Sequence, residues 1–211
     1  MSQLEISTYC GGLAATNSYL VKIKGKTILI DAPEGVFNWV LEQGAQIDYL
    51  FLTHGHWDHI WDGAQIIDHF SCPSGGHPDD AMLFQDPSVM QRFGLTEQID
   101  PVPISESLQE GEWSWAELKS DLLHIPGHCP GSICLVLHEE KVIFGGDVLF
   151  AGAVGRWDLP GGSMEVLLDG IRKKLFPLSD DYTVYPGHGP STTIRQERST
   201  NPFFQKGSGL L

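Results

Sequence analysis

The chain has 211 residues, and 13 Lys and Arg against 27 Asp and Glu give it a formal net charge of −14. This length fits one domain or two small ones, and an apolar content of 41% with ten Phe and six Trp provides for a buried core. Such a composition excludes disorder, and the negative charge disfavours binding to the phosphates of nucleic acids.

The sequence also disfavours a membrane or secreted protein. Its apolar runs are far shorter than the roughly 20 residues of a membrane span. The first residues, MSQLEIST, lack a basic region followed by an apolar stretch, so we expect a cytoplasmic location without membrane contact. The cysteines form no C-x-x-C pair, which favours reduced thiols. The sequence does not indicate the oligomeric state. The four cysteines are Cys10, Cys72, Cys129 and Cys134.

Hydrophobic patterning predicts a mixed α/β chain. In order, it predicts a hairpin of strands 17–24 and 26–31, a helix over 34–43, a strand over 48–53 and a helix over 60–70. Residues 71–103, rich in Pro, Gly and Asp, give no clear assignment. Strands follow at 113–119, 122–125, 132–138 and 141–144, then a helix over 164–175 and a strand over 182–185. Two strand groups with helices favour packed sheets with helices outside, one of several α/β arrangements.

The segment THGHWDH at residues 53–59 places three imidazoles and a carboxylate directly after a predicted buried strand. Side chains alternate along an extended chain, so His54 and His56 would point the same way and grip one metal ion from one side. Asp58 and His59 follow where the strand ends, and a turn would bring them to a second point nearby. A chance cluster of solvated polar residues is the competing interpretation, and the buried strand before it argues against that.

Three further candidate ligands follow predicted strands, each directly after a glycine. They are His128 in PGH, Asp147 in GGD and His188 in PGHG. Glycine lets the backbone approach closely and adopt unusual dihedral angles, as a crowded site requires. One such residue alone would be a weak indication, but with the first four they make a set of five His and two Asp.

This ligand set predicts a hydrolytic site with two divalent metal ions. Imidazole and carboxylate suit Zn(II), Fe(II) or Mn(II), and a set without thiolates is unlike a closed structural zinc site. Seven ligands are too many for one tetrahedral ion. Two divalent ions (+4), Asp58 and Asp147 (−2) and a bridging hydroxide (−1) leave +1, which attracts an anionic substrate. We expect zinc, with iron or manganese as alternatives.

In T-H-x-H-x-D-H at 53–59, with the later His128, Asp147 and His188, the sequence resembles the metallo-β-lactamase superfamily over nearly its whole length. The resemblance implies an α/β fold, an αββα sandwich of two mixed β-sheets packed face to face with helices outside. It also implies how the ligands divide. His54, His56 and His128 would hold one ion, Asp58, His59 and His188 the other, and Asp147 would bridge them.

Later segments resemble the short glyoxalase II-like hydrolases of that superfamily. They are GDVLF at 146–150, VGRWDLPGG at 154–162, YPGHGPSTTI at 185–194 and ERSTNPF at 197–203. This implies a thioesterase that acts on S-D-lactoylglutathione or a similar small anionic thioester through a metal-bridging hydroxide. The β-lactamases of the superfamily usually carry Cys where Asp147 stands, which disfavours lactam hydrolysis. We expect one domain over 1–211, without the C-terminal helical domain of full-length glyoxalase II, so recognition of glutathione stays open.

Further roles are expected for two of these ligands and for two other side chains. Asp147 is expected to be essential as the bridge, and Asp58 would take or relay a proton. Arg156 would either clamp a substrate carboxylate or pair with Asp158. Asp31 is expected to support the metal loop by hydrogen bonding.

Two alternatives from other classes remain. Persulfide dioxygenases share the fold and a G-R-x-D loop, here at residues 155–158, and would hold one Fe(II) on His54, His128 and Asp147. The segment GHGPSTT at 187–193 favours the hydrolase. The other alternative is a metal site with a structural or regulatory role and no turnover. An exposed ligand position on an ion would argue against it, but sequence does not show exposure.

Overall fold

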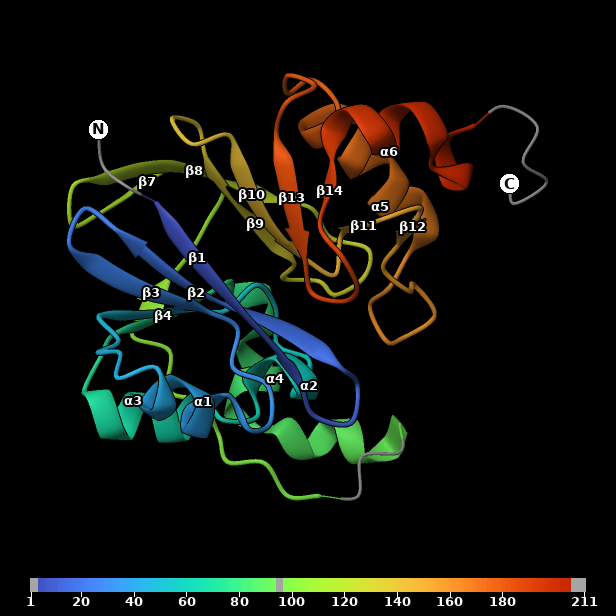
Figure 1. Ribbon diagram of the computed structural model, residues 1–211. Helices are drawn as coiled ribbons and strands as arrows, with labels where there is room; N and C mark the ends of the chain where they lie inside the picture. Colours follow the sequence, from blue (N-terminus) through green and yellow to red (C-terminus); the bar gives the residue numbers. More distant parts are fainter. Residues whose placement is uncertain (1–3, 94–96, 206–211) are drawn as a thin grey trace. The chain divides into compact units, whose positions relative to one another are not determined.

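The computed structural model of the protein describes residues 4–93 and 97–205 (Figure 1). The chain forms two compact units. The first contains the described residues up to Leu108 together with Ser114–Leu118, and the second contains Gln109–Trp113 and the described chain from Lys119 onward. The single domain expected over residues 1–211 stays a prediction.

The first unit contains a mixed sheet of six strands in the order β1-β2-β3-β4-β5-β6. β1 to β3 pair antiparallel, and β3 to β6 pair parallel. Lys24 and Gly25 join β2 to β3 with φ angles of 49° and 75°, as a type I′ turn requires. The strands are β1 (Glu5–Gly11), β2 (Thr16–Ile23), β3 (Lys26–Ile30), β4 (Tyr49–Phe51), β5 (Ser74–Gly76) and β6 (Glu106–Ser107).

Helices α1 and α3 cover one face of this sheet (Figure 1). Val36 and Val40 of α1 and Ile66 of α3 bury their side chains against Leu29 and Leu50, which pair across β3 and β4. This apolar layer fixes the carboxyl end of β4, from which the THGHWDH segment continues. The helical elements are α1 (Val36–Glu42), α2 (Trp57–Ile60), α3 (Gly63–Phe70), α4 (Ala81–Gln85) and the 3₁₀ helices η1 (Pro78–Asp80) and η2 (Pro87–Phe93).

The second six-stranded sheet has the order β14-β13-β10-β9-β8-β7 and is also mixed. β10 pairs antiparallel with β9 and parallel with β13. A small hairpin of β11 and β12 lies outside it. The strands are β7 (Gly111–Trp115), β8 (Leu118–His124), β9 (Ile133–Leu137), β10 (Val142–Gly146), β11 (Leu149–Phe150), β12 (Ala153–Val154), β13 (Thr183–Pro186) and β14 (Thr192–Thr193).

The core of the second unit lies between this sheet and its helices. Leu167 and Ile171 pack against Val136, Ile143 and Val184 of the sheet, all fully buried. The crossover from β10 to β13 therefore returns to the sheet through an apolar helical face, as a parallel pair requires. The helical elements are α5 (Met164–Gly170), a π-helical turn η3 (Ile171–Leu175), α6 (Ile194–Thr200) and the 3₁₀ helix η4 (Pro202–Phe204).

Most predicted elements are confirmed, with two corrections. The strand predicted over 113–119 is wrong, because Ala116 and Glu117, with φ of 45° and 69°, turn the chain between β7 and β8. The helix predicted over 60–70 begins later, as α3 at Gly63, because Trp61 and Asp62 form a turn after α2 ends at Ile60. Residues 71–103 hold β5 and short helical turns. None of the helices in the described part of the chain has the length and apolarity that a membrane crossing requires.

Candidate metal centre

Four predicted ligands lie directly after β4 in the first unit. The three imidazoles have exposed fractions of 5% or less. Helix α2 begins at Trp57 and turns the chain, and it is tied to the end of β3 because Ala32 N donates to His59 O at 2.7 Å. The extended segment followed by a turn agrees with the local structure expected from the sequence. The HxHxDH cluster consists of His54, His56, Asp58 and His59.

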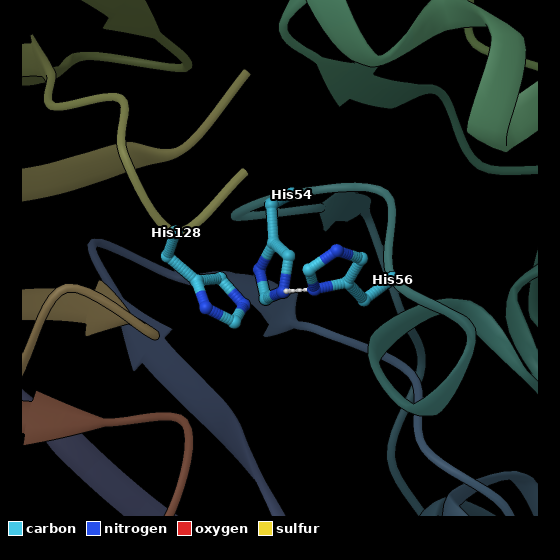
Figure 2. A group of neighbouring side chains, drawn as sticks. All are labelled: His54, His56 and His128. Atoms are coloured by element: carbon cyan, nitrogen blue, oxygen red, sulfur yellow. Dashed lines mark hydrogen bonds between the residues drawn. The ribbon is translucent and has the colours of Figure 1, made fainter. Parts of the chain in front are cut away.

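The spacing of ring nitrogens in this cluster suits a metal ion. His54 Nε2 and His56 Nδ1 lie 3.1 Å apart, within hydrogen-bond distance, and the two rings are nearly perpendicular (Figure 2). Two nitrogen ligands of a tetrahedral zinc ion, each about 2.0–2.1 Å from the metal, lie roughly 3.4 Å apart. A second pair, His59 Nε2 and Asp58 Oδ2, is separated by 3.5 Å. Each pair therefore has the separation of two ligands on one ion.

Asp31 fixes the tautomers of two of these imidazoles. His59 Nδ1 donates to Asp31 Oδ2 at 2.7 Å, and the Thr53 hydroxyl donates to the same oxygen at 2.8 Å. Because that hydroxyl proton points at Asp31, the 3.1 Å contact of Thr53 Oγ1 with His54 Nδ1 has the ring nitrogen as donor. Protonated Nδ1 atoms leave Nε2 of both His54 and His59 as lone-pair donors, the state that a metal ligand needs.

Thr16 contacts one of the candidate ligands, and this contact was not predicted from the sequence. Its side chain is fully buried on β2, and its hydroxyl donates to Asp58 Oδ2 at 2.7 Å. Asp80 is a second such residue, because its Oδ2 accepts from Gly55 N at 2.9 Å between the first two histidines. Neither residue belongs to a recognisable motif, and neither strand β2 nor the 3₁₀ helix η1, which carry them, indicates these contacts in the sequence.

The second-unit cluster consists of His128, Asp147 and His188. β10 and β13 run parallel, so Asp147 and His188 follow the carboxyl ends of neighbouring strands, where Gly187 N donates to Gly146 O at 2.8 Å. Asp147 Oδ2 lies 3.4 Å from His128 Nε2 and 3.3 Å from His188 Nε2. One carboxylate oxygen is thus at ligand–ligand distance from both imidazoles, which is compatible with the bridging role expected for Asp147.

The position of His128, the third side chain labelled in Figure 2, depends on glycines at which the backbone packs closely against other segments. Its Nδ1 donates to Arg156 O at 2.7 Å, which again leaves Nε2 as the lone-pair donor. At Gly127, with φ of 123°, a Cβ would lie 2.6 Å from Ser163 O. At Gly155 a Cβ would lie 1.9 Å from Asp147 O. Only glycine fits these two positions, and Gly127 is one of the glycines that directly precede a predicted ligand.

Arg156 pairs with Asp158, one of the two roles considered for it. Its Nε and Nη2 donate to the two carboxylate oxygens at 2.8 and 2.9 Å, and both side chains are more than 60% exposed. The hydrogen bond from Arg156 lowers the pKa of Asp158. The guanidinium thus holds the Asp158 carboxylate in a forked contact of two parallel hydrogen bonds.

Comparison with known proteins places the chain in a family. The model of the metallo-beta-lactamase superfamily matches residues 11–188. Hydroxyacylglutathione hydrolase GloC of Haemophilus influenzae is 40% identical over 199 residues, which are 91% of this chain and 94% of that protein.

Two solved structures are similar over nearly the whole chain. The B3 metallo-beta-lactamase BLEG-1 has a TM-score of 0.85 and 32% identity, covering 95% of this chain and 100% of that one. TTHA1623 in a di-iron-bound form has a TM-score of 0.84 and 33% identity, covering 93% and 99%. These matches confirm the predicted fold class and the family resemblance.

Proposed function

The chain belongs to the metallo-β-lactamase superfamily and is a metallohydrolase, and from this premise we propose that it hydrolyses a small anionic acyl thioester with two divalent metal ions. The similarity to a hydroxyacylglutathione hydrolase supports S-D-lactoylglutathione or a related thioester as the substrate. The cytoplasmic location stays a prediction.

The single observation that carries the metal proposal is the chemistry of the donor atoms. In each unit the candidate ligand atoms lie 3.1–3.5 Å apart, and three imidazoles are held with Nδ1 protonated and Nε2 available. We propose the ligand sets expected from the family, with zinc as the ion and iron or manganese as alternatives. His54, His56 and His128 hold one ion, Asp58, His59 and His188 the other, and Asp147 serves both.

The reaction breaks the bond between the acyl carbon and sulfur and adds water across it, giving a carboxylic acid and a thiol. When bound, the ions supply Lewis acidity toward the carbonyl and lower the pKa of coordinated water from about 15.7 toward 7. Asp58 receives or relays the proton that water releases, and the Thr16 hydroxyl holds its Oδ2. Thiolate is a fair leaving group, so the residues of the chain need to supply little acid catalysis.

Arg156 gives the site its preference for an anionic substrate in this proposal. Its guanidinium is exposed and already arranged around the carboxylate of Asp158. A substrate carboxylate would replace Asp158 in the same forked contact, which costs less reorganisation than ordering a free arginine.

The test is hydrolysis of S-D-lactoylglutathione by the purified full chain, stripped of metal and reloaded separately with zinc, manganese or iron. We expect turnover with at least one metal, loss of turnover on chelation, and loss of at least 1,000-fold in Asp147→Ala, on the order of other deletions of essential active-site groups. Asp121→Ala, which removes an exposed partner of His138, is the matched control and should retain activity.

Parallel assays separate the rival functions. Other acyl thioesters test the thiol carrier, a chromogenic cephalosporin tests lactam hydrolysis, and oxygen uptake with glutathione persulfide tests the dioxygenase. Oxygen uptake by an iron-loaded protein that hydrolyses no thioester would overturn the proposal. Full turnover by Asp147→Ala would overturn the role of Asp147.

A further inference from the structure

Glu197 is a fully buried carboxylate on α6, outside the set of candidate metal ligands. It accepts three hydrogen bonds from neutral donors: Thr192 Oγ1 at 2.5 Å to Oε1, and Gly152 N at 2.9 Å and Asn201 Nδ2 at 2.8 Å to Oε2. Burial of a carboxylate costs free energy unless its oxygens are satisfied, so a position that retains one calls for an explanation.

The donors belong to the two segments that follow Asp147 and His188. Gly152 is at the tip of the β11–β12 hairpin, five residues after Asp147, and Thr192 is on β14, four residues after His188. Asn201, one turn of α6 beyond Glu197, donates from the same Nδ2 to Ala153 O at 3.0 Å. Glu197 and Asn201 together therefore hold the backbone on both sides of the hairpin tip.

The hairpin connects three features of the second-unit cluster. It begins just after Asp147 and ends just before Gly155, whose α-carbon lies against the Asp147 carbonyl. The backbone carbonyl of the next residue, Arg156, accepts the hydrogen bond that His128 Nδ1 donates. A shift of the hairpin would thus move Asp147 and the acceptor that orients His128, while a shift of β14 would move the loop from His188.

We propose that Glu197 is a positioning residue for the metal centre, which sets the separation of Asp147 and His188 by clamping the segments that follow them. The inference rests on the ligand roles given to these residues in the proposed function. It extends the support of the metal ligands to a helix that supplies no ligand itself.

The experiment measures metal binding, independently of any substrate. Zinc affinity of the full chain is determined by competition with a chromogenic chelator, metal content by elemental analysis after dialysis, and ligand geometry by the visible spectrum of the Co(II)-loaded protein. Glu197→Ala should weaken zinc binding about 10- to 100-fold and alter the Co(II) spectrum. Glu197→Gln should recover most of the loss, because its amide oxygen accepts from Gly152 and Asn201 while its NH₂ donates to the Thr192 hydroxyl.

Arg198→Ala is the matched control on the same helix. Arg198 donates to Phe176 O, to Leu178 O at 2.7 Å and to Asp180 at 3.1 Å, in a segment without predicted ligands. Its loss should lower the melting temperature while zinc affinity and the Co(II) spectrum stay those of the wild type. Thr192→Val removes the hydrogen bond to Glu197 and keeps the volume of the side chain, so the core should stay packed. It should weaken zinc binding less than Glu197→Ala does.

Wild-type zinc affinity and spectrum in Glu197→Ala, or in Thr192→Val if the first variant does not fold, would overturn the inference. Equal losses of affinity in Arg198→Ala and Glu197→Ala would also overturn it, since they would show a general effect of α6 on stability. A wild-type chain that binds two zinc ions but cleaves no thioester would refute the proposed substrate and leave this inference standing.

Discussion

The Asp31 carboxylate binds His59 directly, 2.7 Å from Nδ1, and binds His54 through the Thr53 hydroxyl. One buried side chain thus sets the tautomers of two imidazoles that are candidate ligands of different ions. Asp31 itself has a φ of 58°, a left-handed conformation that Asp and Asn adopt more readily than most residues.

Asp31→Asn should lower zinc affinity about 10- to 100-fold, because in either orientation its NH₂ group faces a donor. That donor is Thr53 N at the position of Oδ1, or the Thr53 hydroxyl and His59 Nδ1 at the position of Oδ2. Asn tolerates the left-handed backbone, so the fold should persist. The measurement is zinc competition together with thermal melting. Asp48→Asn, which alters a carboxylate that binds Lys26 and Thr27, is the control. Wild-type affinity in Asp31→Asn would show that Asp31 does not orient the ligands.

Gly155→Ala should abolish zinc binding by the second-unit cluster or prevent folding, because the added Cβ would lie 1.9 Å from Asp147 O. Gly145→Ala is the control in the same region, since its Cβ meets Val184 at an ordinary 3.5 Å. Metal content and melting temperature of the two variants check the prediction. A Gly155→Ala protein with a full complement of metal would contradict the close approach.

If a substrate carboxylate replaces Asp158 as the partner of Arg156, substitutions of these two residues should change KM in opposite directions. Arg156→Ala should raise KM for an anionic thioester about 10-fold with kcat little changed, because it removes uniform binding. Asp158→Asn should lower KM, because the competing carboxylate is gone. Steady-state kinetics test both, and an unchanged KM in Arg156→Ala would leave Arg156 in its pairing with Asp158 alone.

The cysteines should differ sharply in reactivity. Burial raises the pKa of Cys72 to about 11 and that of Cys134 to about 12, whereas Cys10 is exposed. At pH 8 only about one Cys72 thiol in a thousand is ionised, and the thiolate is the reactive form. A disulfide reagent should therefore label Cys10 quickly in the native protein and all four thiols after denaturation. Cys10→Ser should remove the fast phase. Fast labelling that persists in Cys10→Ser would contradict the burial of the other three.

The sequence predicted the strongly apolar elements of the fold better than the rest, for physical reasons. Strands β9 and β10 and helix α5 are strongly apolar on the faces they bury, so their periodicity is clear. β1 was not predicted, because its exposed positions alternate only loosely with half-buried ones in EISTYCG. The β7–β8 turn was missed because Ala116 and Glu117 adopt positive φ without the Gly or Asn that usually marks such a turn.

The candidate ligands can be recognised in the sequence because their residue types and spacing are unusual. The contacts of the residues that hold these ligands in place cannot be recognised in this way. Glu197 lies in the ERSTNPF segment that carries the family resemblance, but neither Glu197 nor Thr16 shows in sequence that it contacts residues 45 and 42 positions away. Such contacts depend on how strands pair and helices pack, which local patterning does not encode. Asp31 was the exception, because its place after a strand matched a family pattern.

The parallel pairing of β10 with β13 has a consequence for how the protein matures. Parallel neighbours cannot be joined by a tight turn, so the whole crossover through α5 must dock before Asp147 and His188 lie together. The entropy cost of closing so long a loop must be met before the contacts between its ends can stabilise the chain. We therefore expect metal capture by these residues to be a late step of folding, and bound metal to act mainly by slowing unfolding rather than by speeding folding.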